Sequence, residues 1–246
     1  MASSGQKFLL KKQETQPGKE HVMKPLPQAI NPEYKPSNKP RGKVALVTGG
    51  DSGIGRAVCY YFALEGATVA FTYVKGQEEK DKDDTLLMLQ EAKTSDAKQP
   101  LAIAADIGYD ENCKRVIDLK KLLSPSLTGC SEPTLALSSS CVGDPTVLDY
   151  CATKVAIVAF TSGLVLQLVK KGIRVNGVAP GPAWTPLPSA SLPEEMINNF
   201  GSEVPMGRAA QPYEIAPCYV FLASPQCSSY FSGQFLHPNG GMVINT

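Results

Sequence analysis

Histidine is scarce in this sequence, and neither sign of charge is in excess. Only two of the 246 residues are histidine, and the formal net charge is +1. No histidines and cysteines cluster at the spacing of zinc ligands, so we expect no metal site. Proteins dedicated to nucleic acids or membrane surfaces usually carry a basic excess. We therefore expect neither nucleic acid nor a membrane as partner.

The sequence also lacks paired cysteines and long apolar runs. Its seven cysteines are scattered singly and form no C-x-x-C pair, which favours a reducing, cytoplasmic setting over a disulfide framework. The apolar run after Met1 is too short for a secretory signal peptide. The longest apolar stretch, residues 155–169, is shorter than the roughly 18 residues that a membrane-spanning helix needs. We interpret it as a core helix.

Composition changes near residue 40. Residues 1–40 contain many lysines, glutamines and prolines but few large apolar side chains, and such a segment cannot bury enough surface to fold alone. We predict a flexible or surface-draped arm, with a proline-rich docking peptide as the alternative. The rest of the chain, residues 41–246, is long enough for one domain with a sizeable core.

The first half of this domain alternates strands and helices. Apolar runs predict strands at residues 43–47, 67–73 and 101–105, and helical spacing predicts helices at 56–64 and 83–93. This order is typical of an α/β fold with a doubly wound parallel sheet, the Rossmann-like architecture. Further helices are predicted at residues 113–121, 150–171, 193–200 and 212–222, and strands at 173–178 and 233–236.

A glycine-rich turn, TGGDSGIG, joins the first strand to the first helix at residues 48–55. Glycine lets the backbone turn sharply, and the unpaired amides at a helix N-terminus attract an anion. We therefore predict a dinucleotide site, with a merely tight turn as the alternative. The second strand ends with Tyr73 and Lys75, and its first acid is Glu78. A basic residue at this point favours NADP slightly over NAD.

Tyr150 and Lys154 are four residues apart on a predicted helix, so they share one face. An ammonium group nearby favours the phenolate form of a tyrosine, whose ordinary pKa is about 10. Such a tyrosine can exchange a proton with a substrate hydroxyl or carbonyl. This is the proton chemistry that alcohol oxidation needs while a nicotinamide carries the hydride.

These motifs, together with NGVAPG at residues 176–181, resemble the short-chain dehydrogenase/reductase family. The segments QETQPGKEHVMKP, VAFTYVKGQEEKD, GSEVPMGRAAQP and SSYFSGQFLHPNGG are similar to the plant glucose and ribitol dehydrogenase homologues of that family. The resemblance covers about residues 12–118 and 143–246. It implies a Rossmann-like fold, NADP or NAD as the cofactor, and a small-molecule substrate such as a sugar, polyol or carbonyl compound.

The resemblance also implies roles for individual residues. Tyr150 would be the general acid/base, Lys154 would hold the nicotinamide ribose, and residues 184–206 would form a mobile substrate loop. With Tyr73 and Lys75 of the second strand, the expected cofactor-binding residues are Gly49, Ser52, Gly53, Ile54, Gly55, Tyr73, Lys75, Asp106, Ile107, Tyr150, Lys154, Pro180, Gly181 and Thr185.

The stretch between Asp106 and Tyr150 departs from the family pattern. The family places there a helix, a strand carrying Asn-Asn-Ala-Gly, a second helix and another strand. One strand–helix–strand unit alone takes about 30 residues, so the full set cannot fit, and no Asn-Asn-Ala-Gly occurs. We infer that the central strand and the following helix are missing or replaced at about residues 119–142. Residues 134–141 would then either move beside the first strand or leave its edge open.

The family's catalytic serine falls on this altered stretch. It stands thirteen residues before the tyrosine, a position that Leu137 occupies here, and Ser138 is the nearest candidate. A serine-rich loop is the alternative reading of residues 138–140. The homo-oligomer usual for the family is in doubt as well, because its members pair through the missing helix and the helix of Tyr150.

Two functions follow from these observations. The first is an NAD(P)-dependent oxidoreductase that transfers a hydride between its cofactor and a sugar- or polyol-type hydroxyl or carbonyl. The second is a catalytically impaired variant, a splice form or altered gene model, that binds NAD(P) or a partner without turnover. The shortened middle of the chain motivates the second.

Overall fold

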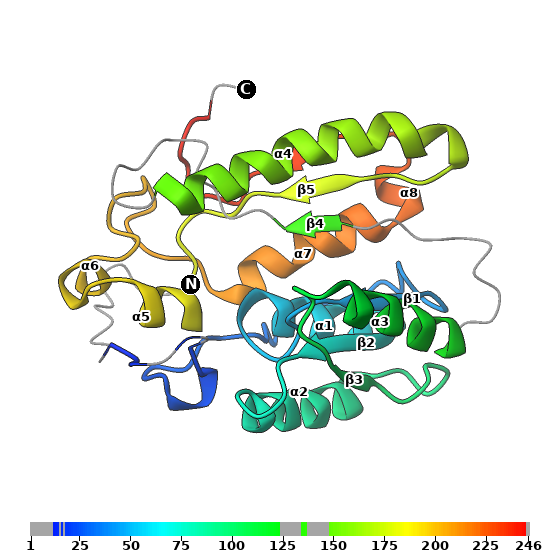
Figure 1. The fold of residues 1–246 in the computed structure, drawn as a ribbon, viewed down its shortest axis with the longest axis horizontal. Coiled ribbons are helices and arrows are strands. Elements are labelled where there is room, and N and C mark those ends of the chain that lie inside the picture. The colour runs from blue at the N-terminus through cyan, green and yellow to red at the C-terminus, as the bar shows by residue number, and fades with distance from the viewer. Residues whose placement is uncertain (1–11, 15, 17, 124–133, 137–147, 245–246) are drawn as a thin grey trace.

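The computed structural model describes residues 12–14, 16, 18–123, 134–136 and 148–244. The elements form two α/β halves that lie against one another (Figure 1). Each half contains a three-stranded parallel sheet, ordered β1-β2-β3 in the first and β4-β5-β6 in the second. The arm meets the domain near the short helices α5 and α6, where it forms one turn of 3-10 helix, η1 (Glu20–Val22).

The first half has the alternation predicted from the sequence. Its elements are β1 (Val44–Val47), α1 (Gly53–Leu64), β2 (Thr68–Tyr73), α2 (Glu79–Ala92), β3 (Leu101–Ala104) and α3 (Asp110–Leu123). Side chains of β2 alternate between the two faces of its sheet. Val69 and Phe71 pack with residues of α1 and α2, whereas Ala70 packs with Val116 of α3. Helices therefore cover both faces, as a doubly wound sheet requires.

The second half consists of β4 (Thr134–Ala136), α4 (Leu148–Leu168), η2 (Val169–Lys171), β5 (Asn176–Val178), α5 (Pro186–Ser191), α6 (Glu194–Asn198), α7 (Pro212–Ala223), α8 (Pro225–Ser228) and β6 (Phe235–Leu236). Helix α7 packs against α1 and joins the halves. Their shared core includes Ala57 and Tyr61 of α1 and Ile215, Ala216 and Tyr219 of α7. This contact fixes the first helix, and with it the glycine turn, relative to the second half.

Among the described strands, β1 has one neighbour. Residues Thr134–Ala136 pair with Asn176–Val178 of β5 rather than with β1. Among the strands that the structure describes, only β2 pairs with β1, in a register that places Val44 opposite Thr68. Of the two outcomes expected for residues 134–141, the described part therefore does not move beside the first strand. Ser138 lies outside the described residues.

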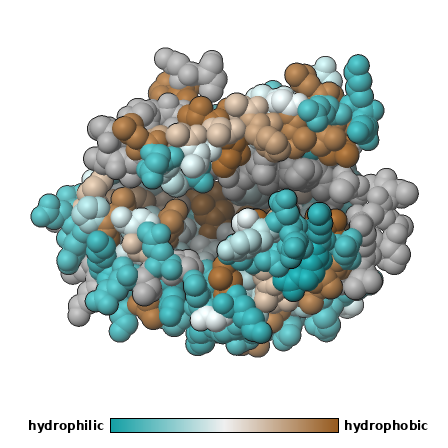
Figure 2. All heavy atoms as spheres, in the orientation of Figure 1, coloured by the Kyte–Doolittle hydropathy of each residue, from teal (hydrophilic) through white to brown (hydrophobic). Residues whose placement is uncertain are grey.

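Helix α4 corrects one expectation. The helix forms, but it is not a core helix, because only Cys151 and Thr161 are buried in it. It lies along β5 (Figure 1), and its outward face includes Val155, Phe160 and Leu166, all more than half exposed. Figure 2 shows apolar side chains along this helix. The strands beneath it have two or three residues each, so the small sheet covers only one side of the helix.

The stretch Leu148–Lys171 is long and apolar enough to span a membrane by length and composition alone. One such helix is weak evidence for a membrane span.

Candidate dinucleotide site

The glycine turn has backbone geometry that other residues tolerate poorly. Gly49 and Gly53 have φ values of 62° and 54°, in the left-handed region that favours glycine. At Gly55, an added Cβ would lie 2.1 Å from the carbonyl oxygen of Gly49. These glycines therefore let the turn close without strain. It places the first amides of α1 at the carboxyl end of β1, the usual position of a pyrophosphate site.

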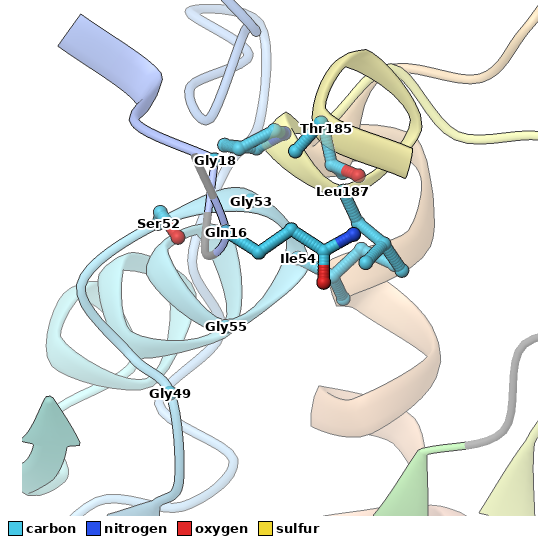
Figure 3. A pocket seen from close by; sticks show the side chains of 11 residues that line it. Gln16, Gly18, Gly49, Ser52, Gly53, Ile54, Gly55, Thr185 and Leu187 are labelled. Carbon is cyan, nitrogen blue, oxygen red and sulfur yellow. The ribbon is translucent and has the colours of Figure 1, made fainter. Parts of the chain in front are cut away.

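A pocket of about 420 Å³ opens over this turn (Figure 3). Small-molecule sites commonly occupy about 300–1,000 Å³. Three segments far apart in the sequence line it, namely the arm, the glycine turn and the start of α5: Gln16, Gly18, Gly49, Ser52, Gly53, Ile54, Gly55, Thr185, Pro186, Leu187 and Ala190. The pocket thus brings Thr185 together with the residues expected to line a pyrophosphate.

The buried side chain of Arg56 holds the glycine turn in place through hydrogen bonds and ion pairs. The guanidinium of Arg56 donates to the carbonyl oxygen of Asp51 through Nε at 2.8 Å and Nη2 at 2.6 Å. It also pairs with Glu20 at 2.6 Å and with Asp81 at 3.3 Å. The second oxygen of Glu20 accepts from the amide of Gly53 at 2.5 Å. These contacts fix the turn from the arm, from α1 and from α2 at once.

Two carboxyl groups, Asp51 in the turn and Glu78 near it, have raised pKa values. Burial, followed by the neighbouring Glu78, raises the pKa of Asp51 to about 7. Burial also raises the pKa of Glu78, whose carboxylate accepts from the amide of Val74 at 2.7 Å. Both groups lie close to the carboxyl end of β2, where an acid or a base selects between NAD and NADP. Lys75, on the same segment, is exposed.

The other expected residues of the first half, Tyr73, Lys75, Asp106 and Ile107, do not line the pocket. The ring of Tyr73 lies 5.7 Å from the ammonium nitrogen of Lys82. Asp106 follows β3, and its carboxylate accepts from the amide of Gly108 at 2.9 Å, while the side chain of Ile107 is about half exposed. Because β1, β2 and β3 are parallel, these residues lie at the same carboxyl end of the sheet as the glycine turn.

Pro180 and Gly181 are buried in the segment that leads from β5 to Thr185. The amide of Gly181 donates to the carbonyl oxygen of Pro238 at 3.1 Å. An added Cβ at Gly181 would lie 2.8 Å from Asn239. The close contact with the C-terminal segment determines where the chain enters α5.

Tyr150 and Lys154 form the expected pair on α4. The ammonium nitrogen of Lys154 lies 5.0 Å from the centre of the Tyr150 ring, and both residues are partly buried. Burial lowers the pKa of Lys154. The lining of the pocket over the glycine turn includes no residue of α4.

Sequence reasoning missed the contribution of the arm. Gln16 and Gly18 line the pocket, and Glu20 contacts the glycine turn. These residues stand about 30 positions before the turn in the sequence, and no periodicity or spacing connects them to it. The composition of residues 1–40 instead predicts a flexible or surface-draped arm.

Comparison with known proteins decides the family. A family model described as short chain dehydrogenase matches residues 43–122, and one described as Enoyl-(Acyl carrier protein) reductase matches residues 126–243. The NADPH-dependent aldehyde reductase 1, chloroplastic, of Arabidopsis thaliana is 56% identical over 281 aligned positions, which cover 95% of this chain and 98% of that protein. The chain belongs to the short-chain dehydrogenase/reductase family.

Two other similar proteins support this family assignment. Glucose and ribitol dehydrogenase of Daucus carota is 53% identical over 292 positions, along the full length of both chains. The apo-form crystal structure of glucose dehydrogenase of Caenorhabditis elegans superposes with a TM-score of 0.66 at 26% identity, covering 81% of this chain and 97% of that one. The Rossmann-like fold, the oxidoreductase class and an NAD(P) cofactor are thereby confirmed. The alignments exceed 246 positions, so these relatives contain residues that this chain lacks.

Proposed function

We propose that this protein transfers a hydride between NADP and a sugar- or polyol-type hydroxyl or carbonyl. The observation that carries the proposal is the pocket in which Thr185 faces the glycine turn. It offers the amides of Ile54 and Gly55 to a diphosphate next to the loop expected to hold the nicotinamide, while the amide of Gly53 donates to Glu20. The choice of NADP over NAD rests on the exposed Lys75 after β2. The name of the Arabidopsis relative, which specifies NADPH, supports the same choice.

The proposed chemistry at the substrate depends on the tyrosine–lysine pair. The nicotinamide, when bound, supplies or accepts the hydride. Tyr150 would donate its phenolic proton to the substrate oxygen during reduction and accept it during oxidation. Lys154, 5.0 Å from the Tyr150 ring, would hold the ribose and stabilise the phenolate. Ser138, outside the described residues, remains the predicted donor to the substrate oxygen.

The test is turnover with a panel of aldehydes, aldoses and polyols, followed by the absorbance of NADPH. We expect reduction of at least one aldehyde or sugar, and loss of that activity in Tyr150→Phe. If the purified protein binds NADPH yet converts no member of the panel, the catalytic part of the proposal is wrong.

Two further observations support a second function, dinucleotide binding without catalysis. No residue of α4 lines the pocket, and the relatives contain residues that this chain lacks. Both favour a protein that binds NADP without converting a substrate. In this case Tyr150→Phe would leave dinucleotide affinity unchanged and there would be no turnover to lose, which separates the two functions in one set of measurements.

The proposed setting is a reducing compartment such as the cytoplasm. The described cysteines are all free thiols, and disulfides are rare where glutathione keeps thiols reduced. A homo-oligomer remains a proposal as well. Its support is the exposed apolar face of α4, which a second copy could cover.

A further inference from the structure

The arm is anchored at the glycine turn by a nearly inaccessible carboxylate. Glu20 is 2% exposed, and its two oxygens contact the amide of Gly53 and the guanidinium of Arg56. The backbone amides of Glu20 and His21 in turn donate to the carboxylate of Asp81 in α2, each at 2.9 Å. Removing one partner from a buried charge pair is strongly destabilising. This end of the arm is therefore an integral part of the fold.

The same arm is bonded to the first helix of the expected substrate loop. The backbone amide of Gln13 donates to the carbonyl oxygen of Ser189, and its side-chain amide donates to the Ser189 hydroxyl, both at 3.0 Å. The side-chain amide of Gln16 reaches the hydroxyl of Ser191 at 3.1 Å. All these acceptors lie in α5, which forms one wall of the pocket.

An apolar contact completes the attachment. Met23 of the arm packs with Trp184 and Ile197 in a small core whose members are at most 2% exposed. The indole nitrogen of Trp184 donates to the carbonyl oxygen of Pro25 at 3.0 Å. Helices α5 and α6 have only six and five residues, too few to be stable without packing partners. Their position therefore depends on the arm.

Gly18 shows how closely the arm approaches the pocket wall. It is buried, and an added Cβ would lie 2.4 Å from the carbonyl oxygen of Pro186 and 3.1 Å from Ala190. Figure 3 shows this segment of the arm between the glycine turn and the start of α5. A side chain at this position would push the arm away from α5 and open the pocket on that side.

We propose that the described arm residues, 12–14, 16 and 18–27, form a wall of the dinucleotide pocket and hold α5 and α6 over the glycine turn. The arm thereby positions the loop before the ligand arrives. A loop that is already ordered need not lose its conformational freedom on binding, so the arm increases affinity. This inference rests on the proposed dinucleotide function. If the arm instead occupied the space of the ligand, it would lower the affinity for the dinucleotide. Loosening the arm would then tighten binding, so the direction of the change in Kd distinguishes the two cases.

The first experiment measures NADPH affinity in the full chain carrying Gly18→Ala. Titration follows NADPH fluorescence and energy transfer from Trp184, the only tryptophan in the sequence. The matched control is Gly163→Ala in α4, where an added Cβ meets no atom within 4 Å. We expect Kd to rise at least tenfold in Gly18→Ala and to change less than twofold in the control. Unchanged or tighter binding by Gly18→Ala would overturn the proposal.

A milder pair covers the case in which Gly18→Ala does not fold. Gln13→Ala removes the side-chain bond to Ser189 of α5 and the two bonds between the Gln13 side chain and Lys19 within the arm. Gln28→Ala alters an exposed side chain just beyond the proposed wall. We expect Kd to rise about three- to tenfold for the first and to stay within twofold for the second. Equal Kd values for the two variants would refute the role of the arm.

A readout without ligand separates this inference from the proposed function. In the ligand-free protein, amide hydrogen exchange at Leu192 and Ile197 should be at least tenfold faster in Gln13→Ala than in Gln28→Ala, while exchange in α1 stays the same. If the wild-type protein does not bind NADPH, the proposed function fails, and the exchange rates still decide whether the arm holds the loop. Equal exchange in both variants would show that it does not.

Discussion

Asp51→Asn should stabilise the ligand-free protein at neutral and alkaline pH. Asp51 belongs to the glycine turn and is 2% exposed, and one of its buried carboxylate oxygens has no hydrogen-bond partner among the described residues. Burial and the neighbouring Glu78 raise its pKa from 3.8 to about 7. The folded protein therefore holds a proton on Asp51 in a pH range where the unfolded chain has released it.

The magnitude follows from the difference between the two pKa values. At each pH between about 4 and 7 the folded state binds more protons than the unfolded state, so the free energy of unfolding falls as pH rises. The full difference corresponds to about 4 kcal/mol as an upper limit, since one pKa unit is about 1.4 kcal/mol. Between pH 5 and 8 we expect a loss of about 2 to 3 kcal/mol. Asparagine does not ionise and avoids this loss.

The assay is urea unfolding of both proteins at several pH values from 5 to 8, without dinucleotide. Comparing the two proteins at each pH removes most contributions from other ionisable groups. The stability of Asp51→Asn relative to wild type should increase by about 2 to 3 kcal/mol over this range. If the two stability curves stay parallel from pH 5 to 8, the carboxyl group is not held protonated and the reasoning about this cluster is wrong.

Three further predictions concern the turn, the tyrosine and the exposed helix. Gly55→Ala should weaken NADPH binding at least tenfold, because its Cβ would meet the carbonyl oxygen of Gly49; fluorescence titration measures this, and unchanged Kd would contradict it. Tyr150→Phe should lower kcat for aldehyde reduction at least a hundredfold while Kd for NADPH changes less than threefold, and retained turnover would exclude the proposed acid/base role. Phe160→Asp should reduce the apparent mass in sedimentation if α4 pairs two copies, and an unchanged mass would count against that interface.

Local patterns predicted the elements whose structure depends on nearby residues. Short apolar runs predict the strands β1, β2 and β3, and the glycine turn is predicted from its position between a strand and a helix. The turn could be interpreted because its closure depends on contacts within residues 48–55, such as the approach of Gly55 to Gly49. The helices at residues 150–171 and 212–222 were also predicted close to their observed bounds.

Features that depend on contacts between residues far apart in the sequence could not be predicted from local patterns. Helix α5 begins with Pro-Leu-Pro and has no apolar period, and it is held by Gln13, which is far away in the sequence. The arm was interpreted from composition alone, which does not reveal the buried pairing of Glu20 with Arg56. The exposure of α4 could not be predicted either, because burial depends on how much sheet lies beneath a helix.

The central claim is that a dinucleotide binds with its diphosphate at the amides of Ile54 and Gly55 in the first turn of α1, next to the Gly53 amide that donates to Glu20. Amide hydrogen exchange at Ile54 and Gly55, measured on the full chain with and without saturating NADPH, tests it most directly. The account predicts that exchange at both amides slows at least tenfold when NADPH is present. Binding of NADPH without protection of these amides, or no binding at all, would contradict it.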